Sequence, residues 1–202
     1  VYVNPEMNAK LGISLGMEID QVARAIEDNP DAKAVLVNNP TYYGICSDLR
    51  AIVKLAHSRG IKVLTDEAHG THLYFGENLP VCGMAAGADM SAISMHKSGG
   101  SLTQSSILLT GKAVKADHVR QIINLTQTTS ASYLLLSSLD ISRRNLALRG
   151  RESFARVAKM AEYARNEINS IGGFYALWRG LVKGNTLFHY HVTPLSRFTP
   201  GF

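Results

Sequence analysis

Short apolar runs alternate along this chain with longer segments in which apolar residues recur at helical spacing. Apolar or β-branched runs predict buried strands at residues 33–38, 61–65, 90–94 and 106–110. Helical spacing predicts helices at residues 18–28, 49–59, 114–123, 131–148 and 151–170. Strands and helices that alternate in this way are typical of βαβ units. The pattern therefore predicts an α/β fold with a mostly parallel sheet flanked by helices.

Capping and turn residues set the limits of two of these helical segments. Ser47 or Asp48 can cap the helix that follows, and Gly60 ends it. Gly150 separates the last two predicted helices.

The predicted secondary structure changes before residue 186. The pair Gly172-Gly173 stops the last predicted helix, and a strand-like run from Thr186 to Val192 follows. We therefore predict that residues 1–185 are part of one major domain. Residues 186–202 are predicted to start a C-terminal region.

Two polar segments follow predicted strands directly. Asp66-Glu67-Ala68-His69 closes the run 61–65, and Ser94-Met95-His96-Lys97 closes the run that ends at Ile93. Ligands of α/β sheets bind outside the carboxyl ends of the strands. At such a position we expect Asp66 to be buried with a cationic partner, and Lys97 to be partly desolvated and nucleophilic. A lysine and an aspartate placed in this way suit pyridoxal phosphate, which bonds to a lysine and holds its pyridinium nitrogen against an acid.

Four sequence blocks carry a family resemblance. They are Asn39-Pro40-Thr41-Tyr42-Tyr43-Gly44, Asp66-Glu67-Ala68-His69-Gly70-Thr71-His72, Ser94-Met95-His96-Lys97 with Leu102-Thr103-Gln104-Ser105, and Thr128-Thr129-Ser130-Ala131-Ser132-Tyr133. In order and spacing they resemble the major domain of the Orn/Lys/Arg decarboxylases over roughly residues 1–190. The short bacterial arginine-decarboxylase-like branch is the most similar. The resemblance implies the fold of the aspartate aminotransferases, also called fold type I, and pyridoxal 5'-phosphate as the cofactor.

The resemblance also implies roles for the residues around the cofactor ring. Lys97 would bond to the cofactor, Asp66 would hold the pyridinium nitrogen, and Ala68 would pack against the ring. His69 would lie near the ring hydroxyl and act with Lys97 and Asp66 in catalysis. A helix cap at Asp66 and a purely structural histidine at position 69 are the alternatives.

A second set of residues is expected at the cofactor phosphate. By the same resemblance, Ser94 and His96 would donate hydrogen bonds to it. Thr129, in the hydroxyl cluster 128–130, would reach a phosphate across the interface of a homodimer or higher homo-oligomer. The same cluster is also consistent with a simple helix cap.

The activity implied is the decarboxylation of a basic amino acid to an amine and CO2, which is a step of polyamine biosynthesis. Arginine is the first candidate substrate, with lysine and ornithine as alternatives. An aminotransferase of the same fold is a further alternative.

Because the chain opens on Val1 and the family's phosphate loop and stacking histidine are expected upstream, we expect a fragment of a longer protein. Such a fragment would fold without binding the cofactor well.

Two other readings of the motif are less favoured. Asp66-Glu67-Ala68-His69 also spells a helicase box, but that function needs a phosphate loop of the form G-x-x-x-x-G-K-[ST], and residues 1–65 contain none. His69 and His72 have the spacing of a metal pair, but no third ligand follows at a suitable distance.

Composition narrows the kinds of binding partner and the cellular compartment that we expect for this protein. The net charge of +5 comes from scattered residues, which does not indicate a nucleic-acid-binding face. No apolar stretch approaches the roughly 20 residues of a membrane helix. The two cysteines, Cys46 and Cys82, form no disulfide framework and are typical of a cytoplasmic protein. A small-molecule substrate is the partner that remains.

Overall fold

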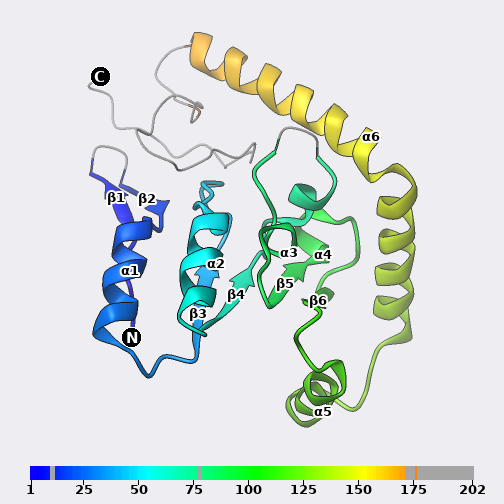
Figure 1. Cartoon of the computed structure of the whole chain (residues 1–202). Coiled ribbons are helices and arrows are strands. Elements are labelled where there is room, and N and C mark those ends of the chain that lie inside the picture. Colours follow the sequence, from blue (N-terminus) through cyan, green and yellow to red (C-terminus); the bar gives the residue numbers. More distant parts are fainter. Residues whose placement is uncertain (10–11, 77–78, 172–175, 177–202) are drawn as a thin grey trace.

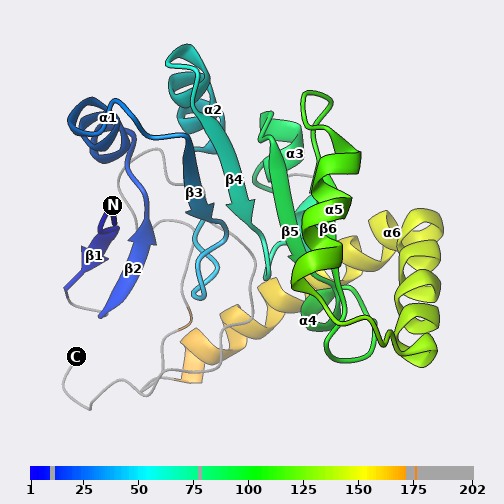
Figure 2. The same ribbon diagram turned by 90° about the horizontal axis from the view of Figure 1, so that it is seen from below.

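The computed structural model describes residues 1–9, 12–76, 79–171 and 176, and its centre is a four-stranded sheet (Figures 1 and 2). The strands are β3 (Ala34–Asn38), β4 (Lys62–Asp66), β5 (Met90–Ser94) and β6 (Ser106–Thr110), in the order β3-β4-β5-β6. β3, β4 and β5 are parallel, and β6 is antiparallel to β5. The predicted α/β fold with a mostly parallel sheet is confirmed, and each strand lies within a residue of its expected range.

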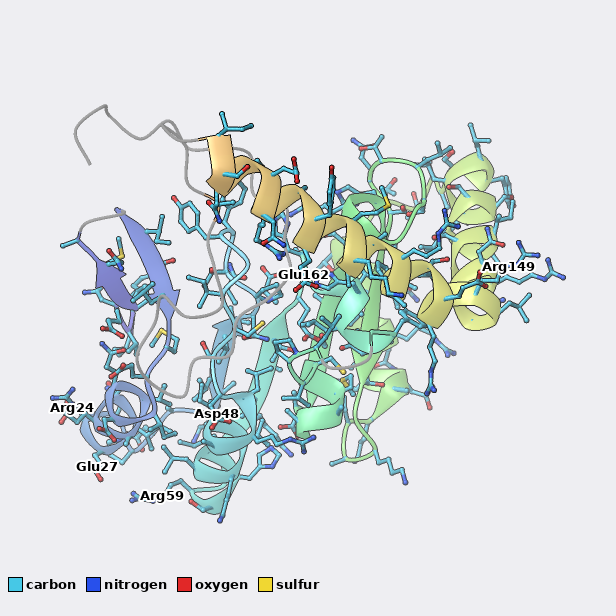
Figure 3. All side chains as sticks on the ribbon, turned by 90° about the horizontal axis from the view of Figure 1, so that it is seen from above. Arg24, Glu27, Asp48, Arg59, Arg149 and Glu162 are labelled. Atoms are coloured by element: carbon cyan, nitrogen blue, oxygen red, sulfur yellow. The ribbon has the colours of Figure 1, made fainter. Side chains whose placement is uncertain are left out.

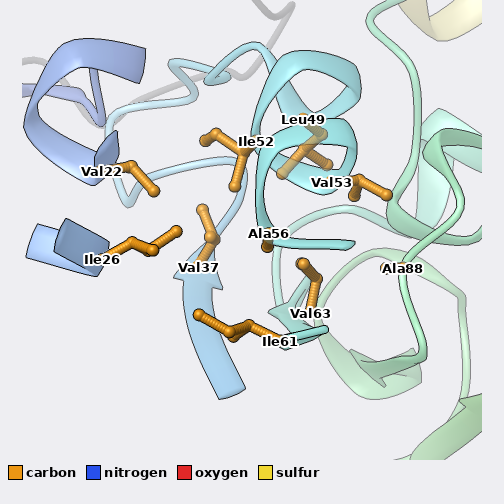
Figure 4. Close-up of a cluster of buried hydrophobic side chains, with 10 residues drawn as sticks. All are labelled: Val22, Ile26, Val37, Leu49, Ile52, Val53, Ala56, Ile61, Val63 and Ala88. Carbon is orange, nitrogen blue, oxygen red and sulfur yellow. The ribbon is translucent and has the colours of Figure 1, made fainter. Parts of the chain in front are cut away.

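Two amphipathic helices, α1 (Ile19–Asp28) and α2 (Leu49–Ser58), build the main hydrophobic core against the sheet (Figure 4). Its fully or nearly fully buried members are Val22, Ile26, Val37, Leu49, Ile52, Val53, Ala56, Ile61, Val63 and Ala88. Burial of each large aliphatic side chain is worth about 1.5–3 kcal/mol. This core fixes β3 and β4, and so the position of the strand ends.

The limits of α2 follow the capping signals. The Asp48 carboxylate accepts a hydrogen bond from the Ala51 N–H at 3.1 Å, which caps the helix as expected. The Arg59 Nη2, at the C-cap of α2, lies 3.9 Å from the Glu27 Oε1 in the last turn of α1 (Figure 3). Both side chains are more than half exposed, so this ion pair contributes little to stability.

Several short elements lie outside the predicted strands and long helices. They are β1 (Glu6–Asn8) and β2 (Ile13–Gly16), which pair antiparallel, a 3-10 helix η1 (Thr71–Tyr74), and the single-turn helices α3 (Gly83–Ala86) and α4 (Met95–Ser98). Each spans three or four residues, which is too short for periodicity to be detected.

The carboxyl-terminal part of the described chain is helical. The predicted helix 114–123 is α5 (Ala116–Thr126). The expected separation near Gly150 is wrong, because α6 runs without interruption from Tyr133 to Ile171, although it changes direction along its course (Figure 1). Gly150 is buried in α6, where a Cβ atom would lie 2.7 Å from the Phe75 ring. The glycine therefore permits a close approach and does not end the helix.

Part of the sequence-based prediction lies outside the described residues. This applies to the stop at residues 172–173, the strand-like run 186–192 and the C-terminal region 186–202. Among the described residues, no helix is both long enough and apolar enough to cross a membrane.

Candidate active site

The two polar segments singled out in the sequence meet at the carboxyl ends of β4 and β5. These strands are parallel neighbours, and Asp66 pairs in register with Ala92. The Lys97 Nζ lies 3.2 Å from the His69 Nε2. The fold therefore brings the lysine of one segment to the histidine of the other, as the position of both segments at strand ends predicts.

Lys97 lies on α4, a single helical turn that begins directly after β5. Its side chain is exposed, and the partial desolvation expected of it stays a prediction. Lys97 is three residues beyond Ser94, the last residue of β5, and the intervening helix carries its side chain out of the sheet.

Asp66 is the last residue of β4, and it is only half-buried. Its Oδ1 accepts a hydrogen bond from the Ala68 N–H at 3.0 Å. The expectation of a fully buried carboxylate is wrong, because the strand ends here and the side chain caps the turn that follows. This contact nevertheless fixes the direction of the carboxylate at the sheet edge.

Ala68 and His69 occupy the turn between β4 and η1, and both are half-buried. The His69 ring contacts Lys97 and also packs edge-on against the Tyr42 ring, with 5.6 Å between ring centroids. Tyr42 belongs to the first of the four motif blocks, so this contact joins three of them at one place.

Ser94 precedes α4 as its N-cap and His96 lies within the helix, and both are half-buried. The His96 Nδ1 lies 2.9 Å from the Ser105 carbonyl oxygen, which also accepts the His96 backbone N–H at 3.3 Å. Because a carbonyl can only accept, Nδ1 carries the proton in this contact. The histidine is thus tied to the loop after Lys97, while its proposed contact with a cofactor phosphate stays a prediction.

Two serines of α6 hold the loop that follows Lys97, and sequence reasoning missed both. The Ser142 hydroxyl, which is buried, donates to the Gly99 carbonyl oxygen. The Leu102 N–H donates to the Ser138 Oγ at 2.7 Å. Residues four apart lie on one face of a helix, so the spacing of the two serines was the available signal.

The hydroxyl cluster at residues 128–130 lies in the connection between α5 and α6 and is exposed. The Ser130 N–H donates to the Thr128 Oγ1 at 3.1 Å. Thr129 is not brought to Lys97 within this chain by any contact of the described residues, and its predicted role across a subunit interface remains untested.

Glu67 is the acid that the sequence analysis overlooked. It is fully buried, and its carboxylate accepts hydrogen bonds from the Gly83 N–H at 2.8 Å and from the Tyr74 and Ser91 hydroxyls at 2.5 Å. Burial raises the pKa of Glu67, and the three donors oppose that rise. Successive residues of an extended strand point to opposite faces, so an acid after the outward-pointing Asp66 was bound to point inward.

The described residues contain no group of three or more histidine, cysteine or acidic side chains able to hold a metal ion. His72 is buried, with its ring 5.9 Å from the ring of Phe154.

The chemistry of this strand-end site fits a carbonyl-bearing ring cofactor. An exposed primary amine, Lys97, is available to bond to a carbonyl carbon. A carboxylate of fixed direction, Asp66, can accept a proton-bearing ring nitrogen. An imidazole, His69, lies between the amine and an aromatic ring. Site and sheet together are typical of the class of α/β proteins in which ligands bind at the carboxyl ends of parallel strands.

Comparison with known sequences gives the family. The profile of the Orn/Lys/Arg decarboxylase major domain matches residues 1–197. Arginine decarboxylase of Halalkalibacterium halodurans is 48% identical over 196 residues, which are 96% of this chain and 40% of that protein. Arginine decarboxylase of Bacillus cereus is 47% identical over 96% of this chain and 43% of that protein. The chain therefore belongs to the Orn/Lys/Arg decarboxylase family, and it spans about 40% of the length of these relatives.

Solved structures give the same fold at much lower identity. The constitutive lysine decarboxylase of E. coli superposes with a TM-score of 0.76 at 18% identity, covering 94% of this chain and 32% of that chain. The pyridoxamine-pyruvate aminotransferase of Mesorhizobium loti superposes with a TM-score of 0.60 at 17% identity, covering 79% of this chain and 44% of that chain. The predicted aspartate-aminotransferase-like fold of type I is thereby confirmed.

Proposed function

We propose that this chain is the cofactor-binding part of a pyridoxal-phosphate-dependent decarboxylase that acts on a basic amino acid. The observation that carries the proposal is the approach of Lys97 Nζ to within 3.2 Å of His69 Nε2, at the ends of two parallel strands of which one ends at Asp66. When bound, pyridoxal phosphate supplies a carbonyl that bonds to amines and a ring that accepts electrons from a breaking bond.

Each residue of the site has a defined task in this proposal. Lys97 supplies the amine that holds the cofactor and later returns a proton to the substrate carbon. Asp66, whose direction the Ala68 N–H fixes, keeps the ring nitrogen protonated. His69 orients the lysine and donates to the ring hydroxyl, and Ala68 lies against the ring face. Ser94, His96 and Thr129 are proposed as phosphate ligands.

Arginine is the first candidate substrate, because the relatives at 48% and 47% identity are named arginine decarboxylases. Lysine and ornithine remain candidates, since the family includes enzymes for all three. The product would be CO2 with agmatine or a diamine, and the cytoplasm is the expected compartment.

A homodimer is the expected assembly. Large apolar side chains are exposed on α5 and α6, including Leu125 at 83%, Tyr133 at 85% and Leu134 at 71%. Extended apolar surface is a mark of protein interfaces. The exposed hydroxyl cluster at residues 128–130 adjoins these side chains, which fits a contribution to a partner's site.

The proposal is tested on the complete polypeptide that carries this chain, loaded with pyridoxal phosphate. It is incubated with arginine, lysine or ornithine, and both CO2 and amine are measured, with Lys97→Ala as the inactive control. Release of CO2 and amine in equal amounts from one of the three supports the proposal. Formation of a 2-oxo acid without CO2 would instead identify an aminotransferase, and a loaded protein without either product would contradict both.

A further inference from the structure

Glu67 closes the loop that carries Ala68 and His69. The Tyr74 hydroxyl, at the far end of η1, donates to the Glu67 Oε2 at 2.5 Å, so this one contact joins the beginning and the end of the loop. The Gly70 N–H donates to the Glu67 carbonyl oxygen at 2.7 Å. Both the side chain and the backbone of Glu67 therefore hold the turn in which His69 lies.

The same residue anchors this loop to the sheet. Its backbone N–H donates to the Ala92 carbonyl oxygen at 2.8 Å, which extends the pairing of β4 with β5 by one residue. The Ser91 hydroxyl on β5 donates to Oε2 at 2.5 Å, and the Gly83 N–H at the start of α3 donates to Oε1 at 2.8 Å. Glu67 thus ties three elements to a single carboxylate inside the core.

The backbone at Gly70 and Gly83 lies close to Glu67. A Cβ atom on Gly83 would lie 2.3 Å from Thr65 Oγ1 and 3.0 Å from Glu67 Oε2, and a Cβ atom on Gly70 would lie 2.9 Å from Glu67 Cβ. Glycine is the residue that permits such close contacts. The chain is therefore packed closely around the buried acid at both ends of the loop.

Burying a carboxylate in a protein core costs free energy, because the charged group loses its hydration. Networks of this kind are often replaced by well-packed apolar residues with no loss of stability, whereas removing one member leaves unpaired buried donors. Geometry gives the acid a further use here, since Glu67 lies next to Asp66 in sequence and two residues before His69.

We propose that Glu67 is a positioning residue for the cofactor site: by fixing the loop from residue 68 to residue 73 against β5 and α3, it sets the directions of the Asp66 carboxylate and the His69 imidazole. The proposal rests on the proposed function, because it requires a ligand at the Asp66–Lys97 edge. Glu67 itself touches neither Lys97 nor that ligand and acts through its two neighbours.

The test compares three variants in the complete polypeptide that carries this chain. Glu67→Gln keeps the shape of the side chain and one acceptor oxygen. The NH2 group of the glutamine can donate a hydrogen bond to a hydroxyl that rotates so that its oxygen accepts. Tyr74→Phe removes the donor that closes the loop. The combined variant Glu67→Leu, Tyr74→Phe and Ser91→Ala replaces the side-chain network by apolar groups, which avoids unpaired hydroxyls in the core but leaves the Gly83 N–H without its acceptor. Thermal unfolding without cofactor is measured first, and pyridoxal phosphate is then titrated by the visible absorbance of the lysine-bonded cofactor.

We expect Glu67→Gln to rescue binding to within about threefold of the wild-type affinity. The combined variant should unfold at a lower temperature than the wild type, because the Gly83 N–H loses its acceptor, but should remain folded. It should bind the cofactor roughly 10- to 100-fold more weakly, the range seen when groups that orient metal ligands are removed. Borohydride trapping should show a matching loss of label at Lys97. Wild-type affinity in the folded combined variant would overturn the proposal.

If the combined variant does not fold, the variant Tyr74→Phe still tests the positioning role of Glu67. It should bind roughly threefold or more weakly while still folded, and unchanged binding in that variant would also overturn the positioning role. Failure of the proposed function gives a different result, because the wild type itself would then show no lysine-bonded cofactor.

Discussion

The Lys97 Nζ lies 3.2 Å from the His69 Nε2, although 28 residues separate the two in the chain. Lys97 reaches this point from the single turn that follows β5, and His69 reaches it from the turn that follows β4. A neutral imidazole nitrogen can accept a hydrogen bond from an amine N–H in this contact. The pair therefore holds the amine at the sheet edge where the Asp66 carboxylate also lies.

Removal of the amine should abolish attachment of the cofactor without unfolding the protein. Lys97 is exposed, so Lys97→Ala leaves no cavity in the core and should change the unfolding midpoint by little. The visible absorbance of lysine-bonded pyridoxal phosphate should be lost completely. Lys112→Ala is the matched control, because Lys112 is also exposed but lies beyond β6. Persistence of the absorbance in Lys97→Ala would show that another amine is used.

Asp66→Asn should reduce turnover strongly while preserving the fold. The amide oxygen of asparagine can still accept the Ala68 N–H, so the turn is kept and only the charge is lost. Loss of one preorganised electrostatic contact costs roughly 10²–10³ in turnover. The measurement is the decarboxylation rate at saturating cofactor, with Asp140→Asn on the exposed side of α6 as control. A near-wild-type rate would mean that Asp66 acts only as a cap.

The serines of α6 should be needed for the loop that follows Lys97. Ser142→Ala leaves the Gly99 carbonyl oxygen without its hydroxyl donor, and we expect a loss of about 1–3 kcal/mol in the free energy of unfolding. Ser138→Ala, at a more exposed position, should cost less. Urea unfolding measures both, and the exposed Ser137→Ala serves as control. Equal stability of all three variants would contradict the role of α6 in holding this loop.

Asp89 should make the free energy of unfolding depend on pH under acidic conditions. Burial alone would raise the pKa of its carboxyl group, but hydrogen bonds from the Val63 N–H, His57 and Lys62 outweigh this and lower it below the ordinary value of 3.8. A lowered pKa means that the folded state binds the proton less readily than the unfolded state. The contribution of Asp89 is therefore fully present above pH 3.8 and is lost as pH falls through the lowered value.

The measurement for Asp89 is urea unfolding from neutral pH down to about pH 2–3, the region in which carboxylates with lowered pKa values titrate. Asp89→Asn should reduce stability near neutrality and flatten the decline in acid. Asp140→Asn, whose carboxylate is largely exposed, should leave the slope unchanged. An identical slope in Asp89→Asn and the wild type would contradict the assignment.

Periodicity was sufficient for the elements with a buried face. The β-branched run 61–65 and the helix after Asp48 were predicted because one side of each packs into the common core. The break predicted at Gly150 failed, since the contact of that glycine with Phe75 is a tertiary feature that local sequence does not report. A glycine within a helix costs only about 1 kcal/mol, which packing can offset.

The meeting of the two motif segments was predictable, because the parallel strands β4 and β5 end side by side. The contact of Lys97 with His69 fits that expectation, while the roles of Asp66, His69 and Lys97 in binding a cofactor stay predictions. The sequence analysis assigned burial to Asp66 and missed Glu67, although strand alternation places Glu67 on the face that buries Val63 and Thr65. The α6 serines were missed because that contact joins segments at least 36 residues apart.

Chemical mapping of the cofactor-bearing lysine tests the central claim most directly. The complete polypeptide that carries this chain is loaded with pyridoxal phosphate, reduced with borohydride and digested, and the modified peptide is sequenced by mass spectrometry. The account predicts that the modification lies on Lys97, in the peptide that begins after Arg59 or Lys62 and contains Ser94-Met95-His96-Lys97. A modification on Lys62 or Lys112, or none at all, would contradict it.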